Sequence, residues 1–253
     1  MRVIVAKNYE EMSRIAAKEI AKLLYVKPEA ILGLATGSTP EGVYKELIEL
    51  NKENRVDFSR VTTYNLDEYK GLTGDHAQSY RYFMNTRLFN HVNIDKNRSH
   101  VPNGVADDFE KECDEYDAAI ENAGGIDLQL LGIGRNGHIG FNEPSDFLNL
   151  NTHVTDLTED TIKVNSRFFD NIDEVPTQAI TMGLGSIMKA KKIILLASGE
   201  SKAEIIAKLV EEKISTRIPA SMLQVHPNVL VIVDQEAASL LKNTSNDGIE
   251  YLK

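Results

Sequence analysis

The stretch from Ile126 to Pro144 reads IDLQLLGIGRNGHIGFNEP, in which a predicted strand is followed by several glycines. Its beginning, Ile126 to Leu131, is mostly apolar and too short for a helix, which is typical of a buried strand in a parallel sheet. Glycines follow at positions 132, 134 and 137, so the chain is predicted to turn tightly where the strand ends. Open α/β sheets bind ligands just outside the carboxyl ends of their strands. The stretch therefore predicts an α/β protein with a ligand site at this turn.

Titratable and amide side chains gather in the same turn. His138 and Glu143 lie close together in the sequence, with Asn136 and Asn142 beside them. Such groups in a turn at a strand's carboxyl end are typical of acid–base chemistry. His138 and Glu143 are therefore candidate catalytic residues.

The segment from Gly132 to Gly137 also matches the G-x-G-x-x-G pattern of dinucleotide-binding proteins. That pattern requires a helix to open at its third glycine, so that backbone N–H groups face a pyrophosphate. Here a further glycine at 140 and a proline at 144 predict an irregular loop. We therefore expect no dinucleotide site.

The length, net charge and cysteine count limit the classes of protein to which this chain can belong. With 253 residues and no repeat, low-complexity tract or linker, the chain is expected to form one domain spanning residues 1–253. The net charge of −10 argues against nucleic acid as a partner. The single Cys113 excludes an intramolecular disulfide and a cysteine-rich metal site. The lack of a signal pattern and of a long apolar run predicts a soluble cytoplasmic protein without a membrane partner.

A second turn, residues 35–40, reads ATGSTP and follows the apolar run Ala30 to Leu34, a predicted buried strand. Thr39 is a candidate N-cap, and Pro40 a candidate first residue of a helix that continues from Glu41 to Asn51. A Gly/Ser/Thr turn at a helix N-terminus presents unpaired N–H groups and hydroxyls, which favours an anion, in particular phosphate. An ordinary strand–helix connection remains the alternative.

Asp67 and Glu68 follow the predicted strand Val61 to Leu66. Paired acids at the end of a strand often belong to a solvated loop or a helix cap. A general base, by contrast, requires a carboxylate that a rigid element holds near the substrate. Because Asp67 is expected at the same sheet edge as the two glycine-rich turns, the sequence favours the general base.

Lys202 occupies an unusual position in a third turn. Lys192 to Ala197 is a predicted strand, and Ser201 with Glu204 forms the capping-box pattern of a new helix. Lys202 then falls in the first turn of that helix, where the dipole disfavours a cation. A bound anion would account for the lysine, and simple exposure to solvent is the alternative.

The segment around residues 158–176 is polar and is rich in Asp and Asn. Its length favours a lid over the site, although a surface helix with a linker fits the pattern equally well. The remaining predicted elements are strands at 3–5 and 229–233 and helices at 8–24, 78–89, 107–122 and 235–242.

Five segments together resemble the glucosamine-6-phosphate deaminase family. They are LGLATGSTP at 32–40, NLDEY at 65–69, GIGRNGHIGFNEP at 132–144, NSRFF at 165–169 and SGESKA at 198–203. The resemblance runs from the first strand to about residue 242. It implies a Rossmann-like α/β fold, with a mainly parallel sheet flanked by helices. It also implies a hydrolase of amino-sugar metabolism that converts glucosamine 6-phosphate and water to fructose 6-phosphate and ammonia, without a metal or redox cofactor.

The resemblance also implies roles for the candidate residues. Asp67 would move a proton between C2 and C1 of the sugar, and His138 would open the ring with its orientation set by Glu143. Asn136 stands where many members have an aspartate of the same relay; asparagine can hydrogen-bond but cannot ionise. The substrate phosphate would lie on a set of turn residues and two cations: Thr36, Gly37, Ser38, Thr39, Arg167 and Lys202.

Two other functions remain as alternatives. A 6-phosphogluconolactonase-like hydrolase would use the same phosphate turn and histidine, but its chemistry has no need for a carbon base at Asp67. A non-enzymatic sugar-phosphate sensor would lose the acid–base residues and would usually carry a DNA-binding region. The intact set Asp67, His138 and Glu143 favours the deaminase.

The resemblance leaves the assembly open, since members range from monomers to hexamers, so a homo-oligomer remains an option. Some members are activated by N-acetylglucosamine 6-phosphate at a subunit interface, through an Arg and a Lys shortly after the FNEP motif. Here His153 and Thr155 occupy those positions, and Asp146 stands where such members have a serine. The sequence therefore predicts little response to that effector.

Overall fold

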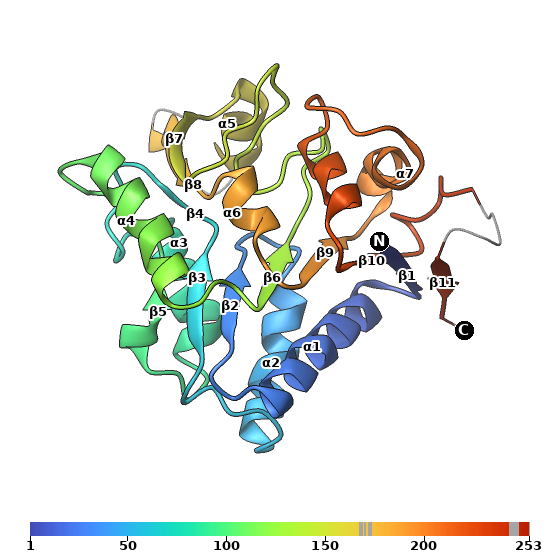
Figure 1. Ribbon diagram of the computed structural model, residues 1–253, viewed down its shortest axis with the longest axis horizontal. Helices are drawn as coiled ribbons and strands as arrows, with labels where there is room; N and C mark the ends of the chain where they lie inside the picture. Colours follow the sequence, from blue (N-terminus) through green and yellow to red (C-terminus); the bar gives the residue numbers. More distant parts are fainter. Residues whose placement is uncertain (167–168, 170, 172–173, 243–247, 253) are drawn as a thin grey trace.

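The computed structural model describes residues 1–166, 169, 171, 174–242 and 248–252 (Figure 1). The strands are β1 (Arg2–Ala6), β2 (Ile31–Leu34), β3 (Thr62–Asn65), β4 (Asp67–Tyr69), β5 (Ser99–His100), β6 (Leu128–Leu131), β7 (His153–Asp156), β8 (Gln178–Thr181), β9 (Ile193–Ala197), β10 (Val229–Asp234) and β11 (Ile249–Tyr251). The α-helices are α1 (Tyr9–Val26), α2 (Glu41–Lys52), α3 (Tyr80–Met84), α4 (Phe109–Asn122), α5 (Glu159–Asn165), α6 (Leu184–Met188) and α7 (Ala203–Glu211). A π-helical turn (Asn85–Phe89) continues α3, and short 3₁₀ helices lie at Lys96–Arg98, Glu200–Lys202 and Pro219–Val225.

The main sheet has eight strands in the order β11-β1-β10-β9-β6-β2-β3-β5. Its pairings are parallel throughout, which confirms the predicted mainly parallel sheet. The central strands β2, β6, β9 and β10 are buried along their whole length, as their apolar runs predict. Because the strands are parallel, their carboxyl ends lie at one edge, and the turns that follow β2, β6 and β9 are neighbours there.

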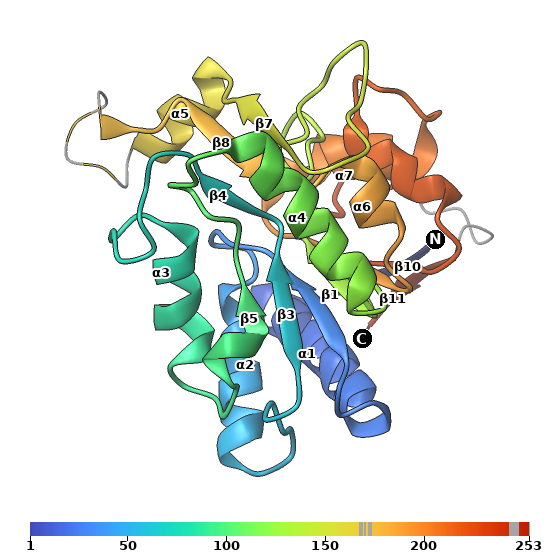
Figure 2. The same ribbon diagram turned by 60° about the vertical axis from the view of Figure 1, so that its left-hand side comes forward.

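Helices cover both faces of this sheet (Figures 1 and 2). Along β2, side chains alternate between the two faces: Leu32 and Leu34 pack with α1, α2 and α3, whereas Ile31 belongs to the core beneath α4, α6 and α7. The result is a three-layer α/β fold with two apolar cores. Among the described residues, no helix has both the length and the apolar character needed to cross a bilayer.

A second sheet, which the sequence did not predict, lies at the carboxyl edge of the first. It has three antiparallel strands in the order β4-β8-β7. Leu66 connects the two sheets, because its N–H donates to Leu34 O (3.0 Å) and its own carbonyl accepts from Met182 N–H (2.8 Å). The strands have only three or four residues and mixed polarity, so they show no clear period along the chain.

Several predicted helix boundaries need correction. The predicted helix at 235–242 is wrong, because its residues form successive turns. Helix α2 begins at Glu41 with Pro40 at the cap position and no side-chain cap, so Thr39 is not its N-cap. Likewise a 3₁₀ turn precedes α7, which starts at Ala203 without the predicted Ser201 cap. Helices α1 and α4 agree with the sequence, and the lid segment contains α5.

Candidate active site

The loop after β6 brings three of the predicted catalytic side chains together. His138 Nδ1 lies 3.1 Å from Glu143 Oε1, although the ring is not aligned for a straight hydrogen bond. Asn136 Nδ2 donates to the second carboxylate oxygen of Glu143 (2.6 Å), and Asn136 Oδ1 accepts from the His138 N–H (3.2 Å). Asn136 therefore joins the histidine and the glutamate, which gives it a positioning role in the loop.

Glu143 is held in its ionised form. Burial alone would raise its pKa, but the contacts with His138, Asn136 and Thr161 outweigh burial and lower the pKa. Thr161 lies on α5 and donates from its hydroxyl to Glu143 Oε1 (2.9 Å). An ionised carboxylate beside an imidazole favours the imidazolium and fixes the orientation of the ring. Residue Thr161 of the predicted lid segment is thereby linked to the predicted acid–base residues.

Glycines allow the loop to take this shape. A Cβ on Gly134 would stand 2.3–2.5 Å from the ring atoms of His138, so the imidazole lies directly on the Gly134 backbone. Gly137 has a φ of 90°, which a side chain would disfavour. In the dinucleotide-binding pattern, Gly134 and Gly137 would lie next to a pyrophosphate. In this protein they allow the imidazole of His138 to pack against the loop backbone.

Asp67 reaches this loop from the second sheet. It is 6% exposed and pairs in register with Thr181 of β8. Asp67 Oδ2 lies 3.7 Å from the point that a Cβ on Gly140 would occupy, and Thr181 Oγ1 lies 2.8 Å from the same point. Gly140 (φ 58°) therefore lets the loop approach the carboxylate closely.

The Asp67 carboxylate has an unusual environment. No hydrogen bond to either oxygen comes from any described residue, although the side chain is buried. Burial and, secondarily, the negative charge of Glu68 raise its pKa to about 8. A buried carboxylate with a raised pKa in a cleft is typical of a catalytic acid or base.

The turn after β2 has the features of an anion site. Gly37 has a φ of 91°, and the backbone N–H groups of Gly37, Ser38 and Thr39 donate to no partner among the described residues. Tyr9 fixes the turn, because its hydroxyl donates to Ser38 O (2.9 Å) and accepts from the N–H of Gly42 (2.8 Å). Thr36 is half-buried at the start of the same turn. The N–H groups are therefore available to a phosphate.

Lys202 joins this edge from the turn after β9. Its Nζ donates to Ile133 O (2.7 Å), which belongs to the loop that carries His138. Burial and, to a lesser degree, the nearby Arg135 lower the pKa of Lys202. Lys202 thus brings a partly buried positive charge to this edge, which is favourable for an anionic ligand. Arg167, the other predicted phosphate ligand, lies outside the described residues.

The sequence missed one residue of the site, Thr181, and noted another, Asn142, without assigning it a role. Thr181 accepts the Phe141 N–H through its hydroxyl (3.0 Å), and Asn142 donates to Ile139 O (2.9 Å) and Met182 O (2.8 Å). Both tie the loop to β8. Buried amides and hydroxyls of this kind satisfy backbone groups, and Asn142 within the FNEP motif was the one available signal.

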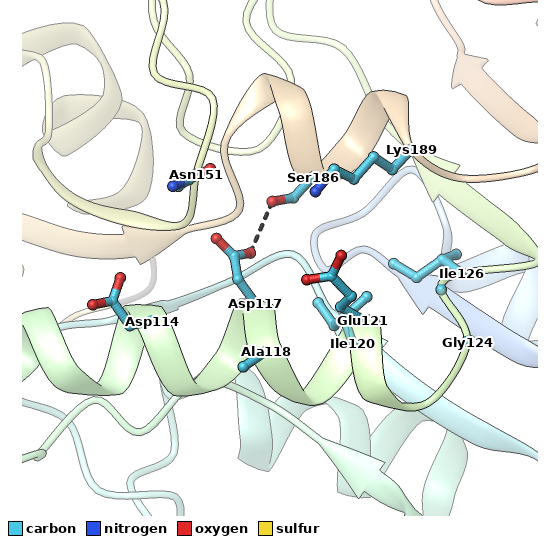
Figure 3. A pocket seen from close by; sticks show the side chains of 11 residues that line it. Asp114, Asp117, Ala118, Ile120, Glu121, Gly124, Ile126, Asn151, Ser186 and Lys189 are labelled. Carbon is cyan, nitrogen blue, oxygen red and sulfur yellow. Dashed lines mark hydrogen bonds between the residues drawn. The ribbon is translucent and has the colours of Figure 1, made fainter.

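A cavity of about 570 Å³ lies away from these residues, between α4 and α6 (Figure 3). Asp117 borders it and accepts from the Ser186 hydroxyl (2.8 Å). The cavity contains none of the predicted site residues. The candidate active site is therefore the carboxyl edge of the main sheet, where the predicted residues that the structure describes lie.

Known proteins resemble this chain over nearly its whole length. The model of the family described as glucosamine-6-phosphate isomerases/6-phosphogluconolactonase matches residues 6–232. A glucosamine-6-phosphate deaminase of Clostridium perfringens is 64% identical over 242 residues, covering 96% of this chain and 100% of the relative. The solved structure of a monomeric glucosamine-6-phosphate deaminase superposes with a TM-score of 0.92 at 50% identity, covering 95% and 100% of the two chains. A 6-phosphogluconolactonase from Thermotoga maritima shares the fold, with a TM-score of 0.73 at 21% identity over 92% and 99% of the chains.

Asp67→Asn is expected to stabilise the protein at alkaline pH. The pKa of Asp67 is raised from 3.8 to about 8 in the fold, so between these values the folded state holds a proton that the unfolded state has lost. Stability should therefore fall as pH rises through this range, and asparagine avoids the fall. Thermal unfolding should show the variant several degrees more stable than wild type near pH 8, with the difference shrinking toward about pH 4.

Asp127→Asn is the matched control, because Asp127 is also buried but lies at the opposite end of β6. Burial opposes its ionisation, but hydrogen bonds from Lys191, Lys27 and the Ile31 N–H lower its pKa. Its contribution to stability is present above the unfolded pKa, so this variant should lose stability at neutral and alkaline pH. Equal or lower stability of Asp67→Asn near pH 8 would contradict the assignment of Asp67.

Proposed function

The chain belongs to the family of glucosamine-6-phosphate isomerases and 6-phosphogluconolactonases, and on that premise we propose that it converts glucosamine 6-phosphate and water to fructose 6-phosphate and ammonia. One observation carries the proposal on the structural side. Asp67 is a buried carboxylate that accepts no hydrogen bond from the described part of the chain, and the loop that holds His138 approaches it at Gly140. These contacts support a carbon base and a ring-opening group at the same edge of the sheet.

Ring opening is the first step and is assigned to His138. The C1 hydroxyl must lose a proton and the ring oxygen must gain one, which converts the cyclic hemiacetal to the open aldehyde. An imidazole suits both transfers, because it exchanges protons near neutral pH. Glu143 and Asn136 hold the imidazole at the loop, as their contacts describe.

Isomerisation is the second step and is assigned to Asp67. The carboxylate takes the proton from C2 of the open chain, giving an enol-amine, and returns a proton to C1, giving a 2-imine. One base that reaches both carbons can perform both transfers. Burial raises the pKa of Asp67 to about 8, which makes its carboxylate a stronger base than an exposed one. A protonated amino group on C2 would in turn favour the ionised carboxylate.

Hydrolysis completes the reaction. Water adds to the C2 imine carbon, the C–N bond breaks, and ammonia leaves with the proton balance supplied by the same water. The products are the 2-ketone, fructose 6-phosphate, and ammonia. A lactonase would need water addition to the ester carbonyl, cleavage of the ring C–O bond and transfer of a proton to the leaving oxygen, but it would need no carbon base with the environment of Asp67.

Phosphate recognition is assigned to the turn at residues 36–39 and to Lys202, with Arg167 from the lid segment. The free N–H groups of the turn and the lysine supply donors and positive charge in a protein whose net charge is −10. We place the reaction in the cytoplasm, where sugar phosphates occur, and the likeness to a monomeric deaminase supports a monomer.

The direct test is ammonia release from glucosamine 6-phosphate by the purified protein, compared with Asp67→Asn. The wild type is expected to release ammonia and fructose 6-phosphate in equal amounts. The variant should lose turnover by about 10²–10⁴-fold or more while still binding substrate, because a positioned base contributes that much. Near-normal release by Asp67→Asn would exclude the carbon-base role, and hydrolysis of 6-phosphogluconolactone without ammonia release would favour a lactonase.

Lys202→Ala and Arg167→Ala are expected mainly to raise KM. A charge-assisted contact to phosphate contributes about 1.5–3 kcal/mol, so each loss should raise KM roughly tenfold or more. Lys208→Ala is the matched control, because Lys208 lies on α7 and pairs with Glu204 away from the turns. Equal activity of the wild type on unphosphorylated glucosamine would show that phosphate is not recognised.

N-acetylglucosamine 6-phosphate is expected to have little effect on the rate. His153 contacts Asn151 O through Nδ1 (2.9 Å), and the nearby Arg217 is paired with Asp146, so the segment offers little free positive charge for a phosphate. Substrate titrations with and without about millimolar effector should both be hyperbolic. A sigmoidal curve that the effector converts to a hyperbola would contradict this expectation.

A further inference from the structure

Glu68 is a second buried carboxylate, directly beside the proposed carbon base. It is 1% exposed and occupies the middle position of β4, paired with Ile180 of β8. Successive side chains of a strand point to opposite faces, so Glu68 points away from the face that Asp67 presents. The reaction described above does not use Glu68.

The two carboxylates have opposite surroundings. Glu68 Oε1 accepts the N–H groups of Tyr69 and Tyr80 (2.8 Å each), and Oε2 accepts the N–H of Arg81 (3.0 Å). Asp67 accepts no hydrogen bond from any described residue. Neighbouring carboxylates in such different surroundings are typical of pairs with separate roles in acid–base chemistry.

The hydrogen bonds of Glu68 connect β4 to the loop of His138. They fix Tyr80 at the start of α3, and the Tyr80 ring packs on Tyr69 (centroids 4.7 Å apart) and stacks on Phe141 (6.2 Å, 8° between planes). Phe141 belongs to the loop after β6, and its N–H donates to Thr181 on β8. Glu68 thus contributes to the position of both the strand that carries Asp67 and the loop that faces it.

The charge of Glu68 is supported by its neighbours. Burial raises the pKa of Glu68, while the three N–H groups and the Arg81 guanidinium act in the opposite direction. Arg81 is itself fixed, because its guanidinium donates to Ser99 Oγ (3.1 Å) and Ser99 O (2.8 Å). No such donors act on Asp67, so Glu68 should ionise before Asp67 as pH rises.

The other elements around Asp67 contribute neutral groups. Burial raises the pKa values of Tyr44 from α2, Tyr80 from α3 and Tyr116 from α4, with the charge of Asp67 among the smaller causes, so these phenols stay protonated at neutral pH. His138 and Glu143 sit together on the facing loop, with His138 Nδ1 3.1 Å from Glu143 Oε1. Glu68 is then the negative charge that acts on Asp67 from within the described residues.

We propose that Glu68 is a positioning residue for the isomerisation: through α3 it fixes the geometry around Asp67, and its negative charge keeps the Asp67 carboxylate strongly basic. This inference rests on the proposed function. Two like charges on adjacent residues of a strand destabilise each other, and a proton on Asp67 relieves the repulsion. The strong basicity of Asp67 therefore depends on the negative charge of Glu68.

Glu68→Gln tests the electrostatic role. In the wild type, kcat/KM should fall on the acid side of about pH 8, where Asp67 becomes protonated. Removing the negative charge should move this acidic limb to lower pH, because Asp67 becomes a weaker base. The plateau kcat should fall about tenfold, since the glutamine amide nitrogen also cannot accept the N–H groups that Glu68 holds. Asp127→Asn, which removes a buried charge at the far end of β6, should lower stability without moving the limb.

Glu68→Asp separates charge from position. Aspartate keeps the charge but is too short to reach the N–H groups of Tyr80 and Arg81 in the same way. The limb should stay within a few tenths of a unit of its wild-type position while kcat falls. An unmoved limb in Glu68→Gln, or wild-type kcat in Glu68→Asp, would overturn the corresponding half of the proposal.

A titration of the wild-type protein tests the proposal without a variant and without measuring turnover. Carbon-13 NMR of the labelled Asp and Glu carboxyl groups should show Glu68 ionising at lower pH than Asp67, with the two titrations coupled. The reverse order would overturn the proposal. A wild type that releases no ammonia would instead refute the proposed function and leave the order of ionisation unaffected.

Discussion

Thr181 on β8 is the point at which the two halves of the site are joined. Its backbone pairs with Asp67 across the small sheet, and its hydroxyl accepts the N–H of Phe141 from the loop that carries His138. A buried backbone N–H needs a partner, so this hydrogen bond fixes the loop against β8 rather than leaving it in solvent. Gly140 then admits the contact at a distance that a side chain would prevent. The relation between the proposed base and the proposed ring-opening group depends on this one junction.

Three buried or half-buried acids around this junction show how local donors set the state of a carboxylate. Glu143 has three side-chain partners, and its pKa is lowered. Glu68 has three backbone donors that partly offset burial. Asp67 has none, and its pKa rises to about 8. Burial without hydrogen bonds destabilises the ionised carboxylate, which makes it a stronger base. It also lowers the stability of the folded protein, which is a common compromise at a catalytic position.

The predicted anion site depends on a different principle. Positive charge and N–H donors are concentrated at one place, although the protein as a whole is negatively charged. The protein carries a net charge of −10, yet Lys202 and Arg135 approach each other at the edge where the N–H groups after β2 lie free. Neighbouring turns of a parallel sheet make this concentration possible, because β2, β6 and β9 end side by side although they are far apart in sequence. The anion proposed at that edge would interact with the Lys202 ammonium and accept hydrogen bonds from these N–H groups.

The sequence by itself determined the parallel sheet and the turns at its carboxyl edge, and it predicted which residues carry out acid–base chemistry. Buried strands and glycine turns are local signals, since the apolar run and the need for positive φ at Gly37 or Gly137 are written in adjacent residues. Only the tertiary structure decided the second sheet, the role of Thr181 and the contrast between Asp67 and Glu68. Those features depend on contacts between segments more than a hundred residues apart, such as Asp67 with Thr181, and on how many donors reach each carboxylate. Two adjacent acids look alike in a sequence. Only the packing around them gives Glu68 three backbone N–H donors and leaves Asp67 with none from the described residues.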